Sequence, residues 1–138
     1  EGAAFEPRPV PGRLATAETL LRALGDEGAV IVDARTEGEY RGRDVRAARG
    51  GAIPGAVHIE WKNNVEAGAY RNADELAALY VPEGVTPDKD VTAYYQGGYR
   101  SAHAYLALRL LGYPKVRNYV ASWAEWGSRE DLPIETPQ

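Results

Sequence analysis

The sequence predicts an α/β fold, in which helices pack against a parallel sheet. Short apolar runs alternate along the chain with segments of helical periodicity, as expected when crossover helices connect parallel strands. Residues 29–32 (Ala-Val-Ile-Val) form a continuous apolar run, which is typical of a strand buried on both faces of a parallel sheet. A length of 138 residues, 44% of them hydrophobic, suits a single globular domain.

The first half of the chain predicts two helices and two strands. Thr16 is placed to cap a helix whose leucines share one face, and Gly25 ends that helix. The buried strand at 29–32 follows. Thr36 then caps a brief helix, and a loop rich in Gly and Arg leads to a short strand at 56–59.

The second half repeats this alternation. A helix is expected from Asn72 to Tyr80, because the acidic residues in its first turn favour the positive end of the helix dipole. A strand follows at 91–95, and a strongly apolar helix runs from about Arg100 to Leu111. The last elements are a strand at 116–120 and a short helix opened by Ser122.

Composition argues against several classes of function. The net charge of −4 gives no reason to expect nucleic acid or an anionic membrane as partner. No apolar run approaches the roughly 18 residues of a membrane span, so we expect a soluble protein and favour the cytoplasm. The absence of cysteine excludes disulfides, thiolate metal sites and thiol catalysis. Because His58 and His103 lie far apart in sequence, we expect no metal, and nothing indicates another cofactor.

The chain is expected to contain one domain at residues 14–138. The preceding residues, 1–13, carry Pro7, Pro9 and Pro11 and predict an extended lead-in or linker. Because the chain begins with Glu1 and not with methionine, we expect it to be a processed or excised piece of a longer chain.

The loop after the strand at 91–95 is the strongest candidate for a site. In parallel α/β sheets, ligands bind at the carboxyl ends of strands, where a loop meets a helix N-terminus. The loop comprises Tyr95, Gln96, Gly97, Gly98, Tyr99, Arg100 and Ser101. Its amides, the helix dipole and Arg100 would form an anion cradle, with the glycines allowing close approach and positive φ. From the loop alone, a simple strand–helix turn explains the same residues equally well.

Other polar residues have structural explanations. Asp33 and Arg35 could form an acid–base pair, but a structural salt bridge is the favoured interpretation. The basic stretch at Arg41, Arg43, Arg46 and Arg49 is interpreted as a solvated loop rather than an anion-gathering surface. Both histidines are interpreted as packed or surface residues. Tyr99 is expected to face solvent or substrate.

A series of motifs, in order along the chain, resembles a rhodanese domain. The first half has Val32-Asp33-Ala34-Arg35, Glu39-Tyr40-Arg41-Gly42, Ile53-Pro54-Gly55-Ala56-Val57 and Trp61. The second half has Gly84-Val85-Thr86-Pro87-Asp88-Lys89, Gln96-Gly97-Gly98-Tyr99-Arg100-Ser101, Leu111-Gly112-Tyr113 and Ser122-Trp123-Ala124-Glu125-Trp126-Gly127. The resemblance covers about residues 14–135 and is closest to the catalytic C-terminal domain of thiosulfate and 3-mercaptopyruvate sulfurtransferases.

The resemblance implies a rhodanese fold, with a central, mostly parallel five-stranded sheet and helices on both faces. It also implies a thiosulfate-like anion as substrate, a second rhodanese domain as partner and no cofactor. In that family the six-residue loop begins with a cysteine that carries a persulfide, and loop amides and the arginine hold the anion. Gln96 to Ser101 match this cradle, and Asp33, Arg35 and Trp123 match structural positions near it.

This chain departs from the family at the nucleophile. Tyr95 occupies the cysteine position, and a phenol with a pKa near 10 cannot carry a transferable sulfur. We therefore expect Tyr95 to plug the site and the chain to be inactive as written. Two further family positions have lost polar groups: a histidine is replaced by Ala52, and an Asp-Gly pair by Val120 and Ala121.

Three functional classes remain open on the sequence. The first is a sulfurtransferase domain that has lost its nucleophile, which the preserved Gly97, Gly98 and Arg100 favour. The second is a non-catalytic binding or regulatory module that docks a partner or an anion, which Ala52 and Val120 favour. The third, a phosphoryl or sulfuryl transferase with a tyrosine nucleophile, lacks a visible paired base and is the weakest.

Overall fold

The structure, a computed structural model that describes residues 6–8 and 10–138, is built around a parallel sheet. Its four strands lie in the order β2-β1-β5-β6 and all pair in parallel. They are β1 (Ala29–Asp33), β2 (Val57–His58), β5 (Asp90–Tyr94) and β6 (Val116–Asn118). The predicted α/β class with a parallel sheet is confirmed.

The sheet has four strands, so the expected fifth is missing from the described residues. Beyond these strands, Leu14 forms a single parallel bridge to Asn118 of β6. The flanking hydrogen bonds, from Ala15 N to Asn118 O and from Asn118 N to Arg13 O, measure 3.0 and 2.9 Å. A turn at Pro11 precedes this contact and a helix cap follows it, so the chain runs beside β6 too briefly to form a strand. Of the predicted lead-in, residues 1–5 and Pro9 lie outside the described residues.

Five α-helices accompany the sheet: α1 (Ala17–Ala23), α2 (Glu37–Tyr40), α3 (Ala73–Tyr80), α4 (Gly98–Leu110) and α5 (Ser122–Trp126). The predicted caps Thr16 and Thr36, and Asn72 at the start of the third expected helix, each form a capping box at α1, α2 and α3, which satisfies amides that a helix start leaves unpaired. The smaller elements are the 3₁₀ turns η1 (Trp61–Asn64) and η2 (Val81–Glu83) and the hairpin strands β3 (Val65–Glu66) and β4 (Ala69–Tyr70).

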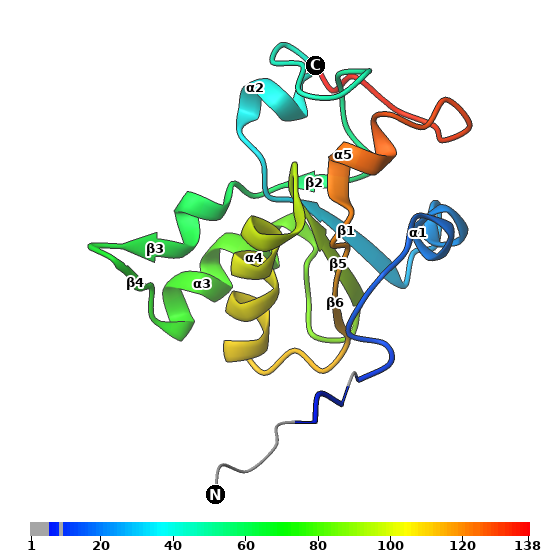
Figure 1. Ribbon diagram of the computed structural model, residues 1–138. Coiled ribbons are helices and arrows are strands. Elements are labelled where there is room, and N and C mark those ends of the chain that lie inside the picture. The colour runs from blue at the N-terminus through cyan, green and yellow to red at the C-terminus, as the bar shows by residue number, and fades with distance from the viewer. Residues whose placement is uncertain (1–5, 9) are drawn as a thin grey trace, which may run out of the picture.

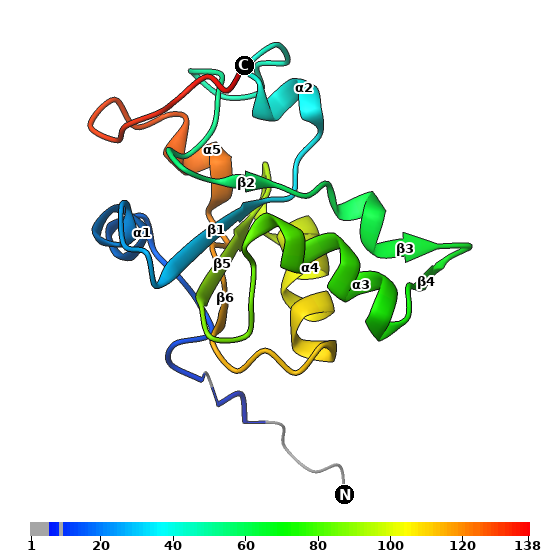
Figure 2. The same cartoon turned by 180° about the vertical axis from the view of Figure 1, so that it is seen from behind.

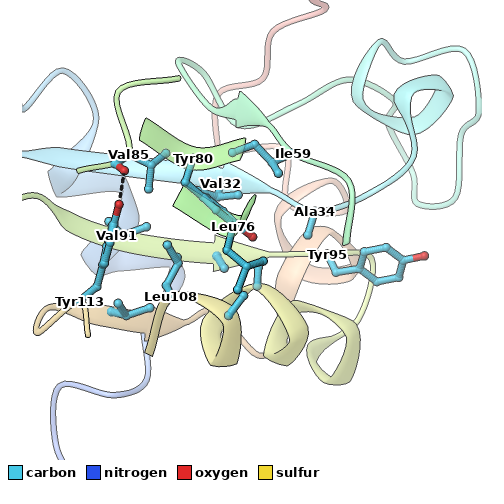
Figure 3. Packing of buried hydrophobic residues seen from close by; sticks show 14 residues of the cluster. Val32, Ala34, Ile59, Leu76, Tyr80, Val85, Val91, Tyr95, Leu108 and Tyr113 are labelled. Atoms are coloured by element: carbon cyan, nitrogen blue, oxygen red, sulfur yellow. Dashed lines mark hydrogen bonds between the residues drawn. The ribbon is translucent and has the colours of Figure 1, made fainter. Parts of the chain in front are cut away.

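Helices cover both faces of the sheet, with α3 and α4 on one face and α1 and α5 on the other (Figures 1 and 2). Each face has its own buried cluster. The first core cluster, which includes Leu76, Tyr80 and Leu108, packs α3 and α4 against the sheet (Figure 3). The second core cluster, which includes Leu20, Trp123 and Trp126, does the same for α1 and α5.

Alternation along β5 determines what its end presents to each face. Tyr94 is buried in the second core cluster, and Tyr95 in the first, because successive side chains of a strand point to opposite faces. Asp33 is paired with Tyr94 on one side and with His58 on the other. The carboxyl ends of three strands therefore bring these residues to one edge of the sheet. In the part of the chain that the structure describes, no helix has the length and apolar character to span a membrane.

Two leucines on α4 test the placement of the first core cluster. Leu108 is fully buried, whereas Leu106 is 45% exposed. We expect Leu108→Ala to lower the free energy of unfolding by about 2–5 kcal/mol, because it leaves a cavity. Leu106→Ala makes the same exchange on the same helix and should cost less than about 1 kcal/mol. Urea denaturation of both variants measures this difference, and equal losses would contradict the assigned faces.

Candidate active site

A buried charged network lies at the carboxyl edge of the sheet. Arg35 Nη2 is 2.6 Å from Asp33 Oδ2, and the same nitrogen donates to the carbonyl of Gly51 at 2.6 Å. The Tyr94 hydroxyl donates to Asp33 Oδ2 at 2.5 Å and accepts from the amide of Ile53 at 3.2 Å. The Arg35 guanidinium carbon lies 4.4 Å from the centre of the Trp123 ring.

The electrostatics of this network favour the charged form of Arg35 and the neutral form of Tyr94. Burial by itself lowers the pKa of Arg35, but the hydrogen bonds and charge of Asp33 outweigh it and raise that pKa above its usual value. Burial raises the pKa of Tyr94 well above its ordinary value, and the charge of Asp33 adds to this. Tyr94 is therefore a neutral donor to the Asp33 carboxylate. Asp33 and Arg35 form a buried ion pair whose side chains are 0% and 1% exposed.

Tyr95 follows directly after β5 and is held through its backbone by α5. Its amide donates to Ser122 Oγ at 3.2 Å, and its carbonyl accepts from the amide of Trp123 at 2.9 Å. The carbonyl of Gln96 accepts from Ala124 N at 3.0 Å. Ser122 itself has a φ of 55°, a left-handed conformation that is rare for serine, and its hydroxyl also donates to Tyr119 O at 2.7 Å. The start of the loop is thereby fixed to the start of α5.

The side chain of Tyr95 bridges the first core cluster and the loop. The residue is 6% exposed, and its hydroxyl points away from the cluster (Figure 3). That hydroxyl accepts a hydrogen bond from Arg100 Nη1 at 2.9 Å. This hydrogen bond raises the pKa of Arg100. Among the described residues no carboxylate or imidazole is hydrogen-bonded to the Tyr95 hydroxyl. A transferase with Tyr95 as nucleophile, the third functional class, would therefore lack a general base at this position.

The loop opens into a cavity of about 290 Å³. Gly97 is the N-cap of α4 and supplies no side-chain cap, so the first amides of this helix lack an intrahelical acceptor. The amides of Gln96 and Gly97 likewise have no acceptor among the residues that the structure describes. Two arginines contribute to the cavity, and Tyr99 is 80% exposed beside it. The lining residues are Arg46, Tyr95, Gln96, Gly97, Tyr99 and Arg100.

Ser101 faces away from this cavity. Its hydroxyl lies within hydrogen-bond distance of two acceptors, Gly98 O at 2.8 Å and Asn118 Oδ1 at 2.5 Å, and Asn118 Nδ2 donates to Gly98 O at 3.2 Å. The Ser101 side chain therefore ties the first turn of α4 to the end of β6. Ser101 and Gly98 are the two predicted loop residues that do not line the cavity.

Only one of the two loop glycines is required, and for a different reason than expected. Neither has a positive φ: Gly97 is extended at −141°, and Gly98 is the first residue of α4. A Cβ on Gly98 would lie 2.5 Å from the backbone oxygen of Val120 and 2.5 Å from its Cγ1, whereas a Cβ on Gly97 would meet no atom within 4 Å. Close packing against Val120 thus requires glycine only at position 98.

The interpretation of the basic stretch as a solvated loop is wrong for Arg49. Its guanidinium donates to the carbonyls of Gly127, Leu132, Trp126 and Arg129, so it fixes the chain after α5. Arg46 is 60% exposed and lies 3.7 Å from the buried Glu39. Nothing in the spacing of the arginines distinguishes Arg49 from its neighbours.

Both histidines pack against aromatic rings. His58 stacks on Tyr40 at 4.8 Å, and its Nε2 is 2.7 Å from the carbonyl of Arg35. His103 Nδ1 is 3.2 Å from the Tyr70 hydroxyl.

Three neighbours of the loop were not predicted as site residues: Ser122, Asn118 and Trp61. The Trp61 ring centre is 5.3 Å from the Arg100 guanidinium carbon. The only available signal was that Trp61 and Ser122 belong to motifs of the resemblance.

Comparison with known proteins shows the family of the chain. The family described as rhodanese-like domain matches residues 16–129. The chain belongs to the rhodanese-like domain family. Curated relatives include the thiosulfate sulfurtransferases of Azotobacter vinelandii, 43% identical over 122 residues, and of Pseudomonas aeruginosa, 40% identical over 139 residues. These alignments cover 88% and 94% of this rhodanese-like domain but 45% and 51% of the relatives. The chain thus spans about half the length of the curated relatives it matches.

Solved structures share the same fold. A variant of EanB in complex with ergothioneine superposes with a TM-score of 0.86 at 26% identity, covering 93% of this chain and 33% of that chain. A second EanB variant, which carries a cysteine persulfide, gives a TM-score of 0.85 at 25% identity over 93% of this chain and 33% of that chain.

Alanine substitution of the two glycines tests the packing at the loop. We expect Gly98→Ala to destabilise the protein by about 1–3 kcal/mol, because the new methyl group overlaps Val120. Gly97→Ala should change stability by less than about 1 kcal/mol, since the loss of a glycine cap and the gain from a less flexible unfolded chain oppose each other. Thermal or urea unfolding compares the two variants. Equal effects would show that Val120 does not set the requirement for glycine.

Proposed function

We propose that this chain is a sulfurtransferase domain of the thiosulfate:cyanide type whose persulfide position is occupied by Tyr95, and that it transfers no sulfur as it stands. The observation that carries this proposal is the hydrogen bond of 2.9 Å from Arg100 to the Tyr95 hydroxyl. Through this hydrogen bond the Arg100 guanidinium binds a side-chain oxygen of the protein itself, at the position where the family has its sulfur nucleophile.

The chemistry of the tyrosine supports inactivity. A sulfurtransferase of this kind needs an atom that attacks the outer sulfur of thiosulfate, retains that sulfur as sulfite leaves, and then releases it to cyanide. A thiolate does this because sulfur forms a persulfide bond that a second nucleophile can cleave. The Tyr95 phenol provides no equivalent carrier, and the chain has no cysteine elsewhere to replace it.

The surroundings of the loop support the binding of an anion such as thiosulfate. Arg46 and Arg100 line the cavity, and the amides of Gln96 and Gly97 and of the first turn of α4 lie at the positive end of the α4 dipole. In a chain with cysteine at position 95, these groups would hold the anionic donor and then the persulfide. Tyr99, 80% exposed, would shape the entrance.

A non-catalytic module is the second candidate, and the side chain of Tyr95 favours it. The ring is buried in the first core cluster, so Tyr95 contributes to core packing in addition to occupying the position of the nucleophile. In this alternative the exposed face around Tyr99 and Arg46 docks a partner or an anion. The relatives are about twice as long as this chain, and a second rhodanese domain is the partner that we propose.

Restoring a cysteine separates the two candidates. We expect Tyr95→Cys to form thiocyanate from thiosulfate and cyanide, because the substitution supplies the missing nucleophile within the existing loop. The chain as given, and Tyr95→Ser as a control that opens the same space without a thiol, should form none. Turnover by the chain as given would contradict the proposed inactivity. An inert but folded Tyr95→Cys protein would favour the binding module.

A further inference from the structure

The guanidinium of Arg100 lies within cation–π distance of two aromatic rings. Its central carbon is 5.5 Å from the centre of the Tyr95 ring and 5.3 Å from that of Trp61. Both distances fall within the range of cation–π attraction, for which tryptophan offers the most favourable face. Tyr95 belongs to the loop, whereas Trp61 belongs to η1, in a different part of the chain.

The Trp61 ring also contacts a second group of rings, those of His103 and Tyr70. The ring of His103 lies 5.0 Å from that of Trp61, and the Tyr70 ring lies 5.9 Å from His103. The Tyr70 hydroxyl donates to the carbonyl of His103 at 3.2 Å. His103 is three residues after Arg100 on α4, a spacing that places both on one face of the helix. The hairpin β3–β4, which contains Tyr70, therefore supports the position of Trp61.

A hydrogen bond of the indole nitrogen does not explain the position of Trp61. Trp61 Nε1 is buried and has no hydrogen-bond partner among the described residues, and a buried donor without an acceptor is unfavourable. Phenylalanine would fill part of the same space without that penalty. What tryptophan adds at this position is the larger and more electron-rich face toward Arg100.

We propose that Trp61 is a positioning residue for the loop, one that holds the Arg100 guanidinium at the cavity from outside the loop itself. The inference deepens the proposed function and rests on it for the reaction. In a protein with cysteine at position 95 the second ring is gone, so Trp61 becomes the aromatic face that keeps Arg100 directed toward the anionic sulfur donor.

The contact is tested first in the chain as given, with no sulfur transfer involved. Labelling with 5-fluorotryptophan gives one fluorine signal for each of the three tryptophans. We expect Arg100→Gln to shift the signal of Trp61 and to leave those of Trp123 and Trp126 in place. Arg109→Gln, on the same helix but bonded to the carbonyl of Tyr113, is the matched control and should shift none. An unmoved Trp61 signal in Arg100→Gln would overturn the proposal.

The consequence for the reaction is tested in the Tyr95→Cys background. Because the persulfide mechanism has two half-reactions, kcat/KM can be measured separately for thiosulfate and for cyanide. We expect Trp61→Leu to lower kcat/KM for thiosulfate about tenfold, and Trp61→Phe about threefold, as the loss or weakening of a cation–π contact predicts. The kcat/KM for cyanide should change much less, since cyanide is smaller than thiosulfate and carries a single charge.

The outcomes distinguish this proposal from the proposed function. Equal losses for the two substrates in folded Trp61→Leu protein, or no loss for either, would overturn the positioning role. Trp61→Phe retains a ring and provides the same comparison if Trp61→Leu fails to fold. If Tyr95→Cys itself is inert, the proposed function fails, and the fluorine spectra of the chain as given decide alone whether Trp61 contacts Arg100.

Discussion

The buried ion pair between Asp33 and Arg35 is the interaction on which the arrangement of the site depends. Arg35 donates a hydrogen bond to the Gly51 carbonyl and lies over the Trp123 ring. Asp33 accepts a hydrogen bond from the Tyr94 hydroxyl. Two charges can stay in such an interior only when their donors and acceptors are satisfied, and removing one partner costs about 3–5 kcal/mol. Because Tyr94 directly precedes Tyr95, the same network determines where the loop begins.

Much of this architecture could be predicted from local sequence. Thr16, Thr36 and Asn72 start helices because their side chains satisfy the first amides. The apolar run that begins at Ala29 and the run that ends before Tyr95 form the two central strands. The place of the loop followed from the general position of sites in parallel sheets. Each of these features depends on residues that are close together in sequence.

The features that could not be predicted depend on contacts between distant segments. Gly98 requires the absence of a side chain because Val120 approaches it, and not because of its own φ. Arg49 fixes the chain after α5 through carbonyls about 80 residues away, which no local pattern reveals. The predicted fifth strand is missing from the described residues, and the chain beside β6 forms only one bridge at Leu14, since the neighbouring turn and helix cap leave too little extended chain. Tertiary packing, rather than residue type, decided each of these.

On the proposed function, this rhodanese-like domain retains the loop of a sulfurtransferase but has Tyr95 in the position of the sulfur carrier. Intact-mass spectrometry of the Tyr95→Cys protein, incubated with thiosulfate and then with cyanide, tests this most directly because it detects the covalent intermediate itself. We expect the Tyr95→Cys protein to gain the mass of one sulfur atom with thiosulfate and to lose it with cyanide, while the chain as given gains none. A folded Tyr95→Cys protein that never gains that mass would contradict it.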